Sequence, residues 1–130
     1  MRVQKFEAFL VWQKAQDYWV FIDDNFKNNK DFSFCNQIKR AAVSISNNIT
    51  EGFDRKTNSD FKRFLYLSLA LNSETRSMLS LAVRLDFIFD QVSKDLIHKS
   101  NERAKMIFGL IKSLKAYVVT INEPLKPTTK

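Results

Sequence analysis

The chain has 130 residues, which is enough for one domain with a single hydrophobic core and too few for two ordinary domains. It holds only two glycines and two prolines, and both prolines lie in its last seven residues, so nearly the whole chain is free of helix breakers. The formal net charge of +7 allows attraction to nucleic acid or to an anionic membrane surface. However, no apolar stretch approaches the length of a membrane span, and the N-terminus lacks the apolar core of a signal peptide. We therefore expect a cytoplasmic protein with no membrane contact.

The first two predicted helices follow from apolar residues spaced by alternating steps of four and three. From Ala8 to Phe26 these residues form one continuous stripe, which the polar run 28–31 ends. Asp31 or Ser33 can then cap a second helix by accepting bonds from free backbone N–H groups. The apolar stripe of this second helix, which ends near Gly52, consists of Cys35, Ile38, Ala42, Ile45 and Ile49.

The third predicted helix has the longest apolar stripe and spans most of residues 59–89. Thr57 and Asp60, at its start, are spaced like a capping box. Ser93 is the predicted N-cap of a fourth helix, whose apolar stripe runs from Ile97 to Ile121. Helices of similar length joined by short connections pack side by side, so the sequence predicts an all-α, antiparallel up-and-down four-helix bundle over residues 1–122. Residues 123–130 are predicted to be a disordered tail.

The stripes leave several large apolar residues on a second face of the first and third helices. In a single chain some of these would contact water, and contiguous exposed apolar surface usually marks an interface. The sequence therefore favours a homo-oligomer, with a broader core within one chain as the alternative. The candidate interface residues are Val11, Tyr18, Phe21, Leu65 and Leu69.

The sequence offers little for catalysis or metal binding. His98 is the only histidine, and Asp95-x-x-His98 is at most half of the ligand set that a di-iron bundle needs. His98 would also be the only conventional base for a hydrolytic triad, and its helix position places it beside lysines on a solvated face. There is no glycine-rich phosphate loop. Cys35 is the only cysteine and is expected to be an unreactive core thiol. We predict no enzymatic activity, no metal and no cofactor.

One face of the second helix, opposite its apolar stripe, carries polar residues in helical register. Their amide and hydroxyl groups can form a buried network with neighbouring helices, or can face water or a ligand. We favour the buried structural network, because these groups do little chemistry without a nearby base. The residues of this face are Gln37, Ser44, Asn48, Glu51 and, at its end, Gly52.

Positive charge concentrates near the C-terminus. From residue 93 onward there are eight Lys or Arg against three Asp or Glu. A charged stripe on an amphipathic helix is usually its solvated face, but it can also track phosphates, and repetition around an oligomer would strengthen that attraction. Lesser basic candidates are the pairs Lys39-Arg40 and Lys62-Arg63. The stripe of the fourth helix is formed by His98, Lys105 and Lys112, and Lys94, Lys115, Lys126 and Lys130 extend it.

The segment Gln37–Gly52, with the sequence QIKRAAVSISNNITEG, resembles the signature of the four-helix-bundle proteins encoded in intervening sequences of bacterial 23S rRNA genes. The flanking segments FLVWQKA (9–15) and FKRFL (61–65) resemble the first and third helices of that family. The resemblance covers about residues 6–90 and departs from the family at Thr50 and at Ala70-Leu71, where the family usually has Ala and a Gly-Ser pair.

The resemblance implies an antiparallel bundle that assembles as a ring, with a pentamer as the expected size and no established activity. Similar bundles act as accessory proteins of diversity-generating retroelements, in which a basic ring engages nucleic acid and a reverse transcriptase. By this analogy of fold we expect a non-enzymatic oligomer associated with RNA or DNA and with a protein partner. The alternatives are a structural interaction module that binds no nucleic acid and, with less support, a metal-dependent bundle enzyme.

Overall fold

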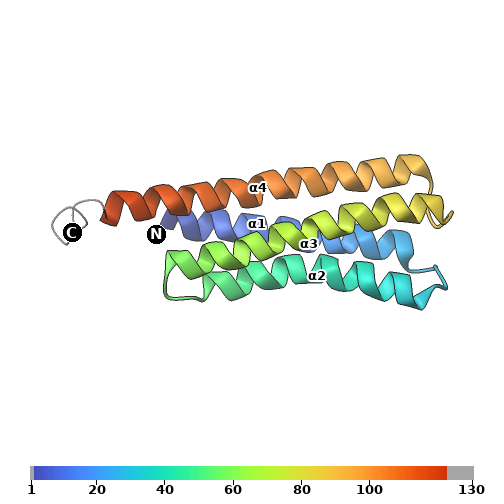
Figure 1. The fold of residues 1–130 in the computed structure, drawn as a ribbon, viewed down its shortest axis with the longest axis horizontal. Coiled ribbons are helices and arrows are strands. Elements are labelled where there is room, and N and C mark those ends of the chain that lie inside the picture. The colour runs from blue at the N-terminus through green and yellow to red at the C-terminus, as the bar shows by residue number, and fades with distance from the viewer. Residues whose placement is uncertain (1, 123–130) are drawn as a thin grey trace.

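The computed structural model describes the backbone of residues 2–122 and the side chains of residues 5–114. This part of the chain forms four helices and no strand: α1 (Arg2–Phe26), α2 (Phe32–Phe53), α3 (Asn58–Arg84) and α4 (Asp90–Asn122). Both α1 and α3 pack against α2 and α4, and consecutive helices run in opposite directions (Figure 1). The predicted antiparallel up-and-down four-helix bundle is therefore confirmed. The predicted tail, residues 123–130, lies outside the described residues.

The starts of α2 and α3 are fixed by the capping residues that the sequence indicates. The carboxylate of Asp31 accepts a hydrogen bond from the backbone N of Phe34 at 3.0 Å, so Asp31 rather than Ser33 is the N-cap of α2. The hydroxyl of Thr57 accepts from the backbone N of Asp60 at 3.1 Å and caps α3. Each cap satisfies a backbone donor that has no partner within its helix.

The boundary between α3 and α4 differs from the prediction. Helix α3 ends at Arg84, because Asp86 adopts a left-handed backbone conformation with φ of 62°. The backbone N–H groups of Asp86 and Phe87 turn back to the carbonyls of Val83 and Ala82, in the Schellman pattern that terminates helices. Helix α4 then begins at Asp90, so the prediction that Ser93 is its N-cap is wrong. Ser93 is buried inside the helix and donates to the carbonyl of Leu79 at 3.0 Å.

Three of the predicted interface residues lie in the core of the single chain instead. Val11, Tyr18 and Leu65 are 4%, 0% and 0% exposed, so none offers surface to another copy. Phe21 and Leu69 are half-buried against the core. The physical reason is that each helix has two neighbours and therefore buries a face wider than one stripe, which is the broader core that the sequence left as the alternative.

The polar face of α2 does not form a buried network, so this prediction is also wrong. Gln37 and Glu51 are exposed. Glu51 forms an ion pair at 2.9 Å with Arg55, which follows four residues later in the chain. Ser44 and Asn48 are half-buried, and the Asn48 amide donates to the carbonyl of Ser44 at 2.8 Å. These local bonds reach no other helix, because most of this face points out of the bundle.

Gly52 is the member of that face with a clear packing role. It is buried, and a Cβ added to it would lie 2.8 Å from both the ring of Phe61 and the Cβ of Phe64. The absence of a side chain therefore lets α2 approach α3 closely beside their connection. Leu71, which stands where the resemblance expects a small residue, is half-buried and packs against the core.

Candidate functional site

The middle of the bundle contains a buried polar layer that joins α1, α3 and α4. The phenol of Tyr18 donates to the hydroxyl of Thr75 at 2.7 Å, because the Thr75 hydrogen is directed to the carbonyl of Asn72, also at 2.7 Å. The Asn72 amide donates to the carbonyl of Ser100 at 3.0 Å, and the Ser100 hydroxyl donates to the Asn72 side-chain oxygen. Arg76 adds a bond to the Ser100 hydroxyl at 2.9 Å. We define these five residues as the polar layer.

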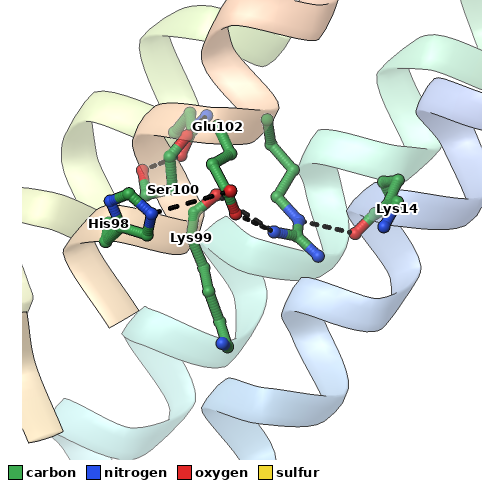
Figure 2. Close-up of polar contacts among 7 residues, drawn as sticks. Lys14, His98, Lys99, Ser100 and Glu102 are labelled. Atoms are coloured by element: carbon green, nitrogen blue, oxygen red, sulfur yellow. Dashed lines mark hydrogen bonds and ion pairs between the residues drawn. The ribbon is translucent and has the colours of Figure 1, made fainter. Parts of the chain in front are cut away.

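Arg103 extends this polar region toward α1. It is only 7% exposed, and its Nε donates to the carbonyl of Lys14 at 3.1 Å (Figure 2). One of its terminal nitrogens lies 3.3 Å from a carboxylate oxygen of Glu102 and donates to the carbonyl of Lys99. The guanidinium charge is thus balanced by a carboxylate that itself reaches solvent, since the Glu102 side chain is 56% exposed.

The bonds of the polar layer hold α1, α3 and α4 in register. Burial raises the pKa of Tyr18 above its ordinary value, so the phenol stays protonated and acts as a donor. Burial likewise raises the pKa of the Cys35 thiol, which donates weakly to the carbonyl of Phe26 and is not activated as a nucleophile. In the part of the chain that the structure describes, no three His, Cys, Asp or Glu side chains gather as metal ligands could.

The first half of α4, residues 90–103, has a balanced surface. It contains three acidic residues and three Lys or Arg. Lys94 pairs with Asp90 at 3.0 Å, and His98 lies 3.6 Å from Glu102, as Figure 2 shows for the latter pair. Two of the predicted nucleic-acid contacts, Lys94 and His98, therefore sit beside carboxylates that reduce their attraction for phosphate.

The second half of α4, residues 104–122, contains three lysines and no acidic residue. Lys105 and Lys112 are exposed, and neither forms an ion pair with any side chain that the structure describes. The Lys112 ammonium lies over the ring of Phe108, 5.3 Å from its centroid. The side chain of Lys115 lies outside the described residues. This half of α4 shares one end of the bundle with the start of α1 and the connection between α2 and α3 (Figure 1).

The pair Lys39-Arg40 is not brought to this surface. Lys39 pairs with Asp23 of α1 at 3.0 Å, and both side chains are largely covered, so this lysine joins α1 to α2. Arg40 is exposed on α2, which does not pack against α4. Within the described residues, no helix is long and apolar enough to cross a membrane.

The comparisons with known proteins agree with this architecture. The family model of the 23S rRNA-intervening sequence protein matches residues 7–109. The chain belongs to this family. It is also similar to a protein of unknown function from the S23 ribosomal protein family of Bacteroides thetaiotaomicron VPI-5482, known from a crystal structure at 1.70 Å resolution. The two chains are 28% identical, with a TM-score of 0.75 over 82% of this chain and 98% of the other. No curated protein sequence matches the chain.

Sequence reasoning missed the residues that matter most on α4. The predicted stripe passed through Ile97 and Ala104, which are half-buried, whereas Leu96, Ser100 and Arg103 are the residues that face the core. A signal was present, because these three continue the helical spacing of Ile107, Leu110 and Leu114. A serine and an arginine in an otherwise apolar stripe could have indicated buried polar bonds.

Proposed function

We propose that this member of the 23S rRNA-intervening sequence protein family is a non-enzymatic, oligomeric bundle that binds RNA or DNA through the second half of α4. The observation that supports this proposal is the pair of exposed lysines, Lys105 and Lys112, on a helix segment without a single acidic residue. When lysines neutralise phosphates, the counterions condensed on the nucleic acid are released, which drives electrostatic binding with little sequence preference. We expect a protein partner to bind the same assembly.

The proposed self-association uses apolar residues other than those predicted from the sequence. The ion pair between Asp23 and Lys39 sets an antiparallel register for α1 and α2. In this register Phe9 lies level with Phe53, and Val20 lies within one residue of the level of Val43. Helical spacing also places Phe9, Val20 and Val43 on the same outer side as the ion pair, and Phe53 lies at the end of α2 with its ring against Phe61 of α3.

We define the α1–α2 surface by these four residues and Phe6. They are all at least partly open to solvent: Phe6 is 64%, Phe9 53%, Val20 47%, Phe53 38% and Val43 36% exposed. Exposed apolar residues gathered along one side of two helices are typical of an interface. A second copy of the chain is the partner we propose, because an isologous or ring contact between identical surfaces needs no other protein.

Binding to nucleic acid can be tested with a matched pair of double variants. Lys105→Gln/Lys112→Gln removes two unpaired lysines, whereas Lys27→Gln/Lys94→Gln removes the same charge from lysines that pair with Asp24 and Asp90. We expect log affinity for RNA to fall linearly with log salt. The slope should flatten only in the first variant, by roughly 0.7 for each phosphate that a removed lysine neutralised. Absence of RNA binding at low salt, or equal slopes for the two variants, would contradict the proposal.

Self-association can be tested by light scattering. The variant Phe9→Glu/Phe53→Glu should dissociate to a monomer, because a buried, unpaired carboxylate opposes association. The variant Phe89→Glu is the control, since Phe89 is 82% exposed in the connection between α3 and α4, which lies at the other end of the bundle (Figure 1). Five subunits is the number that the family resemblance implies for the wild type. A monomeric wild type would overturn the oligomer while leaving the nucleic-acid proposal open to its own test.

A further inference from the structure

Two exposed aromatic residues border the outer line along which α3 and α4 meet. The bonds from Asn72 to Ser100 and from Ser93 to Leu79 set the antiparallel register of these helices. In that register Tyr66 lies level with residue 106, so Tyr66 and Phe108 are separated by about 3 Å along the bundle axis.

Both rings also point to the same side of the bundle. At roughly 100° per residue, Tyr66 lies about 120° around α3 from Asn72, on the side away from Ser68, which donates to the α2 carbonyl of Ile45. Phe108 lies about 80° around α4 from Ser100, on the side away from Arg103, which contacts α1. The two rings therefore flank the same outer surface.

Three lysines lie near these two aromatic rings. Tyr66 is 53% exposed and Phe108 is 47% exposed. Lys112 contacts the Phe108 ring, Lys105 is exposed on α4, and Lys62 lies one turn before Tyr66 on α3. We define the α3–α4 surface by these five residues.

The acidic residues nearest to this surface are directed elsewhere. Asp60 lies near Arg63 on α3, with 3.4 Å between their charged atoms. Glu102 precedes Lys105 by one turn on α4, and its carboxylate oxygens lie 3.6 Å from His98 and 3.3 Å from Arg103. Lys62, Lys105 and Lys112 form no ion pair with any side chain that the structure describes, and two accessible aromatic rings lie among them.

We propose that the α3–α4 surface binds single-stranded nucleic acid. Bases stack on Tyr66 and Phe108, while Lys62, Lys105 and Lys112 hold the phosphates. Single strands expose the flat faces of their bases, whereas a duplex hides them inside its stack, so aromatic rings between lysines favour a single strand. This inference rests on the proposed nucleic-acid function and adds the class of strand and the means of recognition.

The test compares affinities for oligo(rU) and oligo(dT), each roughly 12 nucleotides long, with that for a duplex of the same length. We expect Tyr66→Ala and Phe108→Ala each to lower single-strand affinity by roughly 5-fold or more, and to leave the salt slope unchanged. Tyr66→Phe should keep wild-type affinity, because it retains the ring. The control Phe89→Ala removes an exposed ring from the opposite end and should have no effect.

The outcomes separate this inference from the proposed function. Wild-type single-strand affinity in both ring variants, together with weaker binding by Lys105→Gln/Lys112→Gln, would overturn stacking and leave electrostatic binding intact. Duplex binding as tight as single-strand binding would likewise overturn it. Failure of the wild type to bind any strand would overturn the proposed function itself. Tighter binding of oligo(rU) or of oligo(dT) identifies the source of the strand, and the ring variants must lose affinity for that strand.

Discussion

The two halves of α4 share one helical backbone, but they differ in which side chains they bury and which they expose. Residues 90–103 direct Ser93, Ser100 and Arg103 into the bundle and neutralise their surface lysine and histidine with nearby carboxylates. Residues 104–114 bury only aliphatic side chains and expose Phe108 and two lysines, which pair with no carboxylate among the described side chains. The comparison shows that one helix can fix the register of a bundle with one segment and leave another segment available for binding.

The largest expected effect comes from breaking the contact between Asn72 and Ser100, which holds the first half of α4 against α3. Asn72→Ala removes both bonds to Ser100 in a part of the core where Asn72 and Ser100 are each 0% exposed, and it leaves the Ser100 hydroxyl with only its bond from Arg76. We expect a loss of about 2–4 kcal/mol in the free energy of unfolding, measured by urea denaturation. The control Asn48→Ala, on the outer face of α2, should change it by no more than about 0.5 kcal/mol. Equal losses in the two variants would show that the polar layer has no special role.

Substitution of the glycine in the second half of α4 is a second test of the difference between the two halves. A Cβ added at Gly109 meets no atom within 4 Å, so Gly109→Ala should stabilise the protein by about 0.5–1 kcal/mol through helix propensity. The same change at Gly52 forces a Cβ against Phe61 and Phe64 and should cost about 1–3 kcal/mol. Thermal or urea unfolding of the two variants measures both effects. A loss of stability at Gly109 would mean that the second half of α4 is covered by another surface, such as a second copy.

The smallest effect concerns the ionisation of Tyr18, where the polar layer meets α1. Burial raises its folded-state pKa above the ordinary value of 10.0. The stabilisation that the protonated phenol provides is therefore fully present below pH 10.0 and is lost as pH rises through the higher folded pKa. Unfolding free energies of wild type and Tyr18→Phe, followed from roughly pH 8 to pH 11, should converge at the alkaline end. Parallel curves would place the phenol in contact with water.

Much of the fold could be predicted because each decisive signal is local. The stripe Cys35, Ile38, Ala42, Ile45 and Ile49 is buried as expected, and the caps at Asp31 and Thr57 form as their spacing indicates. The basic half of α4 was also visible in the sequence, since the spacing of Lys105 and Lys112 depends only on helix geometry.

The errors have one common source, which is that a stripe does not reveal how many neighbours a helix has. Tyr18 and Leu65 were assigned to a second copy because each helix was given a single apolar stripe, yet both lie in the core of one chain. The polar residues of α2 were expected to be buried, and Glu51 is exposed. Buried polar bonds form instead between Asn72 and Ser100. These residues are 28 positions apart in the sequence, so no local pattern indicates that they meet.

By itself the sequence determined four helices, the N-caps of the second and third, their antiparallel order and the surplus of lysine near the C-terminus. Only the tertiary structure decided which serines, asparagines and aromatic rings are enclosed and which remain open. The reason is that periodicity is a property of one helix, whereas burial depends on the angle at which each helix meets its neighbours. Tyr66 and Phe108 acquire a common surface from that packing, although their spacing along the chain gives no sign of it.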